Sequence, residues 1–190
     1  SEEGQALMRI VAGEWRGRSI KAPPGETTRP TADRTRETLF NMLASRLGTF
    51  EGLSVADLFA GSGALGLEAL SRGCASCLFV EEDKRAIEAI RANIAALDAN
   101  ARCSVNQASV LRLGPAKVAH DLIMLDPPYG TNAGAVAIDR LVRLGWVGPA
   151  TLVSLEVSAK DEVAIRGLEI EAERKVGKAK LYLLRLAPTT

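Results

Sequence analysis

The segment Asp57-Leu-Phe-Ala-Gly61-Ser-Gly63-Ala-Leu-Gly66 places three glycines between an apolar run, residues 53–59, and a helical pattern over residues 64–71. Glycine lacks a Cβ, so such a turn can be tight and can let a ligand approach the backbone closely. The G-x-G-x-x-G spacing is typical of nucleoside-cofactor sites, although any tight strand–helix turn can be rich in glycine. The segment predicts the first strand–turn–helix unit of an α/β sheet.

Two acidic residues near this turn favour a cofactor. Glu81 lies twenty residues after Gly61, at the end of the next apolar run, where a carboxylate can accept both ribose hydroxyls. Asp57 precedes Gly61 by four residues inside an otherwise apolar strand end. The alternative for Asp57 is a structural cap on the turn. The turn with Glu81 suits NAD as well as S-adenosylmethionine.

The rest of the chain alternates strands and helices. Parallel strands with helical crossovers are buried on both faces, so the pattern predicts an α/β, Rossmann-like fold with a mostly parallel seven-stranded sheet and an antiparallel C-terminal strand pair. Ligands of such sheets lie at the carboxyl ends of the strands, near the switch in strand order. Thr31 and Asp83 are predicted to cap helices. Further strands are predicted at residues 77–80, 101–105, 122–125, 151–157, 168–174 and 180–186, helices at 31–46, 83–97 and 134–144, and a small hairpin at 9–21.

A second motif, Asp126-Pro127-Pro128-Tyr129, directly follows the predicted strand at residues 122–125. An exocyclic amine on an aromatic base is a poor nucleophile, and a site helps by accepting both of its N–H bonds. Asp126 offers a carboxylate, and the Pro127 carbonyl is held rigidly because proline fixes φ. Tyr129 offers a ring on which an extruded base can stack. The alternative is a proline-rich turn with an aspartate cap.

Composition excludes several classes of protein. No apolar run is long enough to span a bilayer. The three cysteines, Cys74, Cys77 and Cys103, argue against a disulfide framework and for a reducing, cytoplasmic compartment. The single histidine and the lone Cys-x-x-Cys pair give no metal site, so we expect no metal. Neither a G-x-S-x-G elbow nor a lysine after the glycines is present.

Charge is concentrated near the N-terminus, although the whole chain carries a net charge of only +1. Residues 8–46 hold eight basic and four acidic side chains, which is either a solvated surface or a phosphate contact surface. We divide the chain into an added or disordered tail at residues 1–7, an extension at 8–50 and a catalytic domain at 51–190.

The chain resembles the bacterial 16S rRNA guanine-N2 methyltransferase family over nearly its whole length from Met8. The most particular stretch is Thr28-Arg-Pro-Thr-Ala-Asp-Arg-Thr-Arg-Glu-Thr-Leu-Phe-Asn41, and Arg9-Ile-Val-Ala-Gly-Glu-Trp-Arg-Gly17 also matches. The turn and the tetrapeptide occur more widely among class I methyltransferases.

The resemblance implies S-adenosylmethionine-dependent methylation of the N2 amine of a guanine in 16S rRNA, within an assembling 30S subunit. We expect a monomer that does not act at a membrane. The resemblance also implies that the tetrapeptide is catalytic and that the N-terminal hairpin and helix bind RNA and close the site. The implied cofactor residues are Asp57, Phe59, Gly61, Ser62, Gly63, Gly66, Glu81, Ala108 and Ser109. The implied nucleic-acid residues are Arg9, Trp15, Arg16, Arg18, Arg29, Arg34 and Arg36.

Two departures from the family pattern affect these expectations. The family usually has an acid near the cofactor adenine, where this chain reads Gln107-Ala-Ser109, so the contact falls to the Ser109 hydroxyl or the Ala108 backbone. The family favours an Arg-x-Tyr-Gly stretch near the C-terminus, where this chain reads Arg174-Lys-Val-Gly177 and lacks the tyrosine.

Three other functions stay open. DNA adenine-N6 or cytosine-N4 methyltransferases use a similar tetrapeptide, but 190 residues leave little room for a target-recognition domain. An NAD-dependent oxidoreductase would also use the glycine turn and Glu81. A non-catalytic RNA-binding module could keep the same fold.

Overall fold

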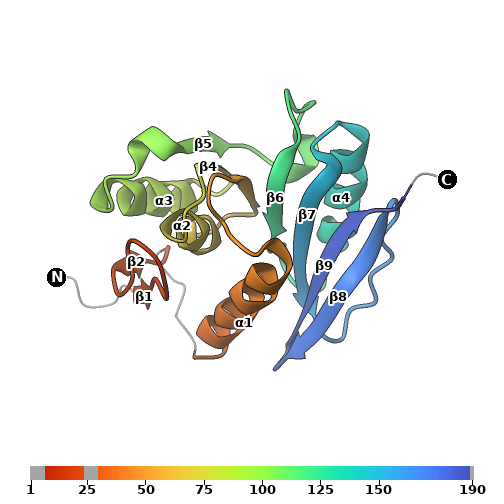
Figure 1. The fold of residues 1–190 in the computed structure, drawn as a ribbon, viewed down its shortest axis with the longest axis horizontal. Coiled ribbons are helices and arrows are strands. Elements are labelled where there is room, and N and C mark those ends of the chain that lie inside the picture. Colours follow the sequence, from red (N-terminus) through yellow and green to blue (C-terminus); the bar gives the residue numbers. More distant parts are fainter. Residues whose placement is uncertain (1–6, 24–29, 189–190) are drawn as a thin grey trace.

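The computed structural model describes residues 7–23 and 30–188 as a central seven-stranded sheet with helices on both faces (Figure 1). The strand order is β5-β4-β3-β6-β7-β9-β8, with β9 antiparallel to both of its neighbours and the other pairs parallel. This confirms the predicted sheet and its antiparallel C-terminal pair. The strands are β3 (Ser54–Leu58), β4 (Ser76–Glu81), β5 (Cys103–Gln107), β6 (His120–Leu125), β7 (Val147–Ser158), β8 (Leu168–Val176) and β9 (Ala179–Leu186).

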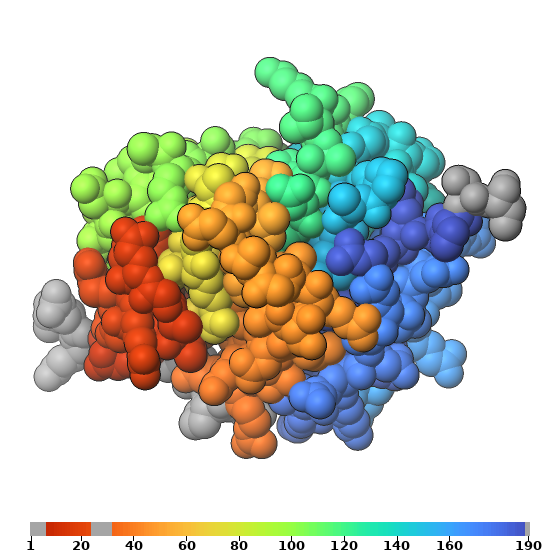
Figure 2. Space-filling view, in the orientation of Figure 1, coloured from red at the N-terminus to blue at the C-terminus, as the bar shows by residue number. Residues whose placement is uncertain are grey.

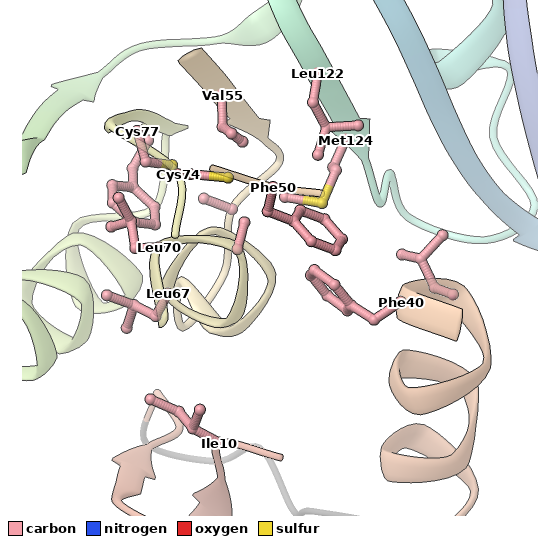
Figure 3. Packing of buried hydrophobic residues seen from close by; sticks show 14 of the residues in the cluster. Ile10, Phe40, Phe50, Val55, Leu67, Leu70, Cys74, Cys77, Leu122 and Met124 are labelled. Carbon is pink, nitrogen blue, oxygen red and sulfur yellow. The ribbon is translucent and has the colours of Figure 1, made fainter. Parts of the chain in front are cut away.

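Side chains of the central strands alternate between two cores, because successive residues of a strand point to opposite faces. In β6, Leu122 and Met124 belong to one apolar cluster, and Ile123 and Leu125 belong to the other. The first cluster packs against α1 (Pro30–Leu47), α2 (Ala64–Ser71) and α3 (Lys84–Ala96). Figure 3 shows the ring of Phe40 on α1 beside that of Phe50, with the ring centroids 5.8 Å apart. The second cluster packs against α4 (Ala133–Arg143).

Helix boundaries agree with the sequence closely, with one correction at α1. That helix begins at Pro30, so Thr31 lies inside its first turn and does not cap it. Proline suits a first helical position, because the N–H that it lacks would have no intrahelical acceptor there. The Asp83 prediction is confirmed, since its side chain accepts a hydrogen bond from the Arg85 backbone N–H at 2.9 Å.

Strand boundaries are less accurate, and β5 begins two residues later than expected. The reason is a short 3-10 helix at Asn100–Arg102 that takes up residues assigned to the strand. The N-terminal hairpin is confirmed as β1 (Leu7–Arg9) paired with β2 (Ser19–Lys21). Leu7 is therefore part of the fold, which corrects its assignment to the tail.

The hairpin is fixed to α2 by buried polar groups. The Glu68 carboxylate accepts the backbone N–H groups of Val11 and Ala12 at 2.8 and 3.2 Å, and the Ser71 hydroxyl accepts that of Trp15 at 2.9 Å. The approach is so close at Gly13 that a Cβ there would lie 1.9 Å from the Ser71 carbonyl oxygen. Figure 2 shows the hairpin seated directly against the α2 and α3 segments.

Candidate functional site

The two sequence motifs meet at the switch in strand order. β3 lies between β4 and β6, and the chain leaves β3 toward β4 on one side while β6 continues the sheet on the other. Parallel strands present their carboxyl ends at one edge, so the turn after β3 and the tetrapeptide after β6 emerge side by side. The Asp126 backbone N–H donates to the Leu58 carbonyl at 3.4 Å and joins the two segments.

One open cavity of about 1670 Å³ contains both motifs. Its lining comes from the turn after β3, the ends of β4 and β7, the tetrapeptide, the β8–β9 turn and the first part of α1. The predicted site residues that line it are Phe59, Gly61, Ser62, Glu81, Ser109, Asp126, Pro128, Tyr129 and Arg36. A turn and a tetrapeptide on separate surfaces would have excluded a shared site, whereas in the structure both line one cavity.

The backbone of the turn keeps space open beside the cavity. Gly61 has a φ of +58°, and a Cβ placed on it would meet nothing within 4 Å. Gly63 has a φ of +82° and forms the left-handed N-cap of α2. Phe59 has a φ of +59°, a conformation that costs free energy for a residue with a Cβ, and its side chain lines the cavity. The turn therefore offers backbone to a ligand where a side chain would obstruct it.

Gly66 serves packing and does not line the cavity. A Cβ at this position would lie 2.4 Å from Phe79 Cε1 and 2.7 Å from Cys77 Sγ, both on β4. The third glycine of the motif thus lets α2 approach the sheet, and its contribution to a cofactor site is indirect.

Asp57 is buried beneath the turn. Its Oδ2 accepts the Gly66 backbone N–H at 2.9 Å, while its Oδ1 is buried without a hydrogen-bond partner among the described residues. Burial raises the pKa of Asp57 to about 8, an effect that the Gly66 hydrogen bond opposes and the Glu81 charge adds to. Asp57 is therefore the cap considered in the sequence, and it also has an unsatisfied acceptor atom that a cationic or N–H-bearing group can complete.

Glu81 joins the turn to the end of β4. Its Oε1 accepts the Gly61 N–H at 2.9 Å and its Oε2 accepts the Asp83 N–H at 2.8 Å, so both oxygens are oriented at the cavity wall. Each carboxylate oxygen can accept a further bond, as two ribose hydroxyls require. Ser109 lines the cavity, and the Ala108 backbone N–H donates to the Glu81 carbonyl oxygen at 3.0 Å.

The tetrapeptide divides between the cavity and the core. Asp126, Pro128 and Tyr129 line the cavity, whereas Pro127 is buried and lies against Gly134 at the start of α4. The Tyr129 hydroxyl donates to Glu156 Oε2 at 2.6 Å. Burial, with this hydrogen bond next, raises the pKa of Tyr129 far above its ordinary value, so the phenol stays protonated.

The predicted nucleic-acid residues divide into exposed and buried groups. Arg9, Arg16, Arg18 and Arg34 are exposed, and Arg29 lies outside the described residues. Trp15 is only 6% exposed and packs in the core beneath the Arg102 guanidinium, which corrects the expectation of an RNA contact, because a covered ring has no face free for a base.

Arg36 is likewise mostly buried. Its guanidinium donates to the Arg9 carbonyl at 2.8 Å and pairs with Asp33 at 3.6 Å. Arg36 therefore ties α1 to the hairpin, and it lines the cavity as well.

Among the cavity residues that sequence reasoning missed are Glu156 and three lysines. Glu156 lies in β7, and its only sequence signal is an acidic residue in a predicted apolar strand. Lys160, Lys175 and Lys178 line the cavity mouth, and none of these lysines has an ion-pair partner among the described residues. Lys175 and Lys178 flank the β8–β9 turn at Gly177, where the sequence departs from the family pattern.

Other chemistry has little support in the described part of the chain. It contains no group of three side chains able to hold a metal ion. Cys74 and Cys77 are buried, and burial raises the pKa of Cys74 to about 12, so its thiol is not nucleophilic at neutral pH. None of the helices it contains has the length and apolarity to cross a bilayer.

Comparison with known proteins places the chain in one family. Residues 8–185 match the family described as conserved hypothetical protein 95. The ribosomal RNA small subunit methyltransferase D of Escherichia coli is 37% identical over 156 residues, covering 82% of this chain and 77% of that protein. That of Haemophilus influenzae is 39% identical over 166 residues, covering 83% and 82%. The structure of the putative methyltransferase yhhF from Escherichia coli superposes with a TM-score of 0.82 at 32% identity, covering 97% of this chain and 100% of that one.

The buried unsatisfied oxygen of Asp57, the open space at Gly61 and the oriented Glu81 carboxylate suit the cofactor of such enzymes. The chain belongs to the conserved hypothetical protein 95 family, and it is an S-adenosylmethionine-dependent methyltransferase.

Proposed function

We propose that this protein methylates the N2 amine of a guanine in 16S rRNA, of the guanine-966 type, on an assembling 30S subunit. The observation that carries the proposal is the single cavity in which the Gly61 turn, Glu81, Asp126 and Tyr129 meet. The names of the relatives, which describe methyltransferases of small-subunit ribosomal RNA, support the class of substrate. The enzyme acts in the cytoplasm as a monomer and needs no metal.

We assign cofactor binding to the residues at the carboxyl ends of β3 and β4. The Glu81 carboxylate binds the ribose hydroxyls, Ser109 or the Ala108 backbone contacts the adenine, and Asp57 lies beneath the amino-acid part. Bound S-adenosylmethionine supplies an activated methyl group on a sulfonium. Phe59, Ser62 and Gly63 shape the wall around it, and Gly66 supports that wall from behind.

The base end is assigned to the tetrapeptide. The Asp126 carboxylate and the Pro127 carbonyl accept the two N–H bonds of the amine, which orients its nitrogen toward the methyl group. Tyr129 is 47% exposed, so its ring can stack on an extruded base, an interaction worth ~1–3 kcal/mol. Catalysis then consists of positioning and electrostatics.

The RNA surface is assigned to basic residues of the hairpin and α1 and to the β8–β9 turn. Arg9, Arg16, Arg18 and Arg34 are exposed on the first two elements, and Arg29, which lies outside the described residues, stays a sequence-based prediction. Lys175 and Lys178 at the β8–β9 turn line the cavity. Cations beside a cavity can hold the phosphates that flank an inserted nucleotide. We further propose that residues 8–50 act as the RNA-binding and site-closing extension of a catalytic domain at 51–190.

The decisive experiment uses 30S particles from cells that lack this protein. The particles are incubated with methyl-labelled S-adenosylmethionine and the enzyme, and the labelled nucleosides are separated and located. We expect N2-methylguanosine from wild-type protein, no product from Asp126→Asn with cofactor binding retained, and normal product from Asp139→Asn on the outer face of α4. Label confined to adenine or cytosine would refute the substrate, and label on DNA alone would favour the DNA methyltransferase.

A further inference from the structure

Glu156 and Asp126 lie side by side at the carboxyl edge of the sheet. β6 and β7 are parallel, and Leu125 is in register with Leu155, so the next residue of each strand is a carboxylate at the same edge. Both side chains line the cavity. The sequence separates them by thirty residues, and only the strand pairing brings them together.

Glu156 interacts with two residues of the tetrapeptide. Its Oε2 accepts the Tyr129 hydroxyl at 2.6 Å, and Asp126 follows the neighbouring strand at the same position of the sheet edge. Burial raises the pKa of Glu156, while its interactions with Tyr129 and Asp126 oppose the rise. Two neighbouring carboxylates can share one proton, so the pair is a place where one proton can reside.

Within the described part of the chain, few other charges reach this pair. On β9 the residue in register with Glu156 is the apolar Leu181, and the adjacent Lys180 is paired with Glu173 at 3.5 Å. Asp161 accepts the Gly130 N–H at 3.3 Å beside Tyr129, and Lys160 and Lys178 line the cavity mouth.

We propose that Glu156 is a positioning residue for methyl transfer: it holds Asp126 and the Tyr129 ring in place and takes up, through Asp126, the proton that the amine releases. This inference rests on the proposed function. As the nitrogen–carbon bond forms and the carbon–sulfur bond breaks, the nitrogen carries one proton too many and the sulfur becomes a neutral thioether. That proton passes from the nitrogen to Asp126 and is then held between Asp126 and Glu156.

Two variants distinguish the positioning role of Glu156 from its role in proton uptake. Glu156→Gln keeps an acceptor for the Tyr129 hydroxyl but cannot take up a proton, so we expect KM for 30S particles near the wild-type value and kcat at least tenfold lower. Glu156→Ala also removes the acceptor, so its KM should rise as well. The dissociation constant for S-adenosylmethionine and the melting temperature should stay unchanged in Glu156→Gln. Glu162→Gln, an exposed change on the loop after β7, is the matched control and should behave as wild type.

The pH profile tests proton uptake. In the wild type, kcat should rise with pH as the pair loses its proton, with the midpoint above the ordinary carboxyl range. In Glu156→Gln only Asp126 titrates, so this acid limb should move to lower pH.

Three results would overturn the proposal: a loss of kcat smaller than tenfold in Glu156→Gln, an acid limb that does not move, or weakened cofactor binding, which would give Glu156 a structural role. A wild-type enzyme with no activity on guanine would instead refute the proposed function itself.

Discussion

Replacing Gly66 by alanine tests whether the third glycine of the motif is needed for packing. Two effects oppose each other. Alanine in a helix interior is favoured over glycine by about 1 kcal/mol. The added Cβ would meet Phe79 Cε1 at 2.4 Å, Cys77 Sγ at 2.7 Å and Phe79 Cζ at 2.9 Å.

The steric effect should dominate because the neighbours have nowhere to move. Phe79 is 0% exposed and Cys77 is 2% exposed, in the middle of the α2–β4 packing. Overpacking a tight core costs about 1–3 kcal/mol, and approaches this short belong at the upper end of that range. The net loss of stability is about 2 kcal/mol, which lowers the melting temperature by roughly 4–8 °C for a chain of this size.

Thermal and urea unfolding of the cofactor-free protein measure this loss. The double variant Gly66→Ala/Phe79→Leu provides the control, because a smaller side chain at 79 relieves the clash and its cost should be less than the sum of the two single costs. Unchanged or increased stability of Gly66→Ala would refute the packing role, since helix propensity would then dominate.

Three more variants test the site. Gly61→Ala should weaken S-adenosylmethionine binding, measured by calorimetry, more than it lowers stability, because its Cβ would enter open space beside the cavity while a φ of +58° adds only about 1 kcal/mol of strain. For Asp57→Asn, the stability relative to wild type should increase from pH 5 to pH 8. In that window the native aspartate keeps a proton that the unfolded chain has lost, so the wild type alone loses stability as pH rises toward its raised pKa of about 8. Parallel urea titrations at each pH check this, and a constant difference would contradict the burial of Asp57. Lys175→Ala/Lys178→Ala should weaken RNA binding without affecting the cofactor, with Lys117→Ala as the control. The slope of log affinity against log salt should become shallower by about 0.7–0.9 for each phosphate that the variant no longer neutralises. An unchanged slope would remove the β8–β9 turn from the RNA surface.

The sequence predicted the parts of this protein that depend on local pattern. The glycine turn, the helix over residues 64–71 and the Asp83 cap each rest on neighbouring residues, and the structure contains all three. Boundaries shifted where a local turn competed with a strand, as at Asn100–Arg102.

Features that depend on distant pairing could not be seen. Glu156 acquires its place only because β7 lies beside β6, and an acidic residue in an apolar run does not indicate such a neighbour. The prediction for Trp15 was wrong for the same reason, since its burial depends on Ser71 of α2 and on Arg102, which lie more than fifty residues away. The different roles of Gly61 and Gly66 also required knowledge of which glycine faces β4.

Helix α2 connects the cofactor turn to the N-terminal hairpin, which matters for how cofactor binding and RNA binding depend on each other. Its first residue follows the cofactor turn, and its last two turns carry Glu68 and Ser71, which hold the basic hairpin. The helix has eight residues and is nearly all buried, so it joins the turn to the hairpin as one short packed element. If cofactor occupancy alters the affinity of the hairpin for RNA by some factor, thermodynamic linkage requires RNA to alter cofactor affinity by the same factor.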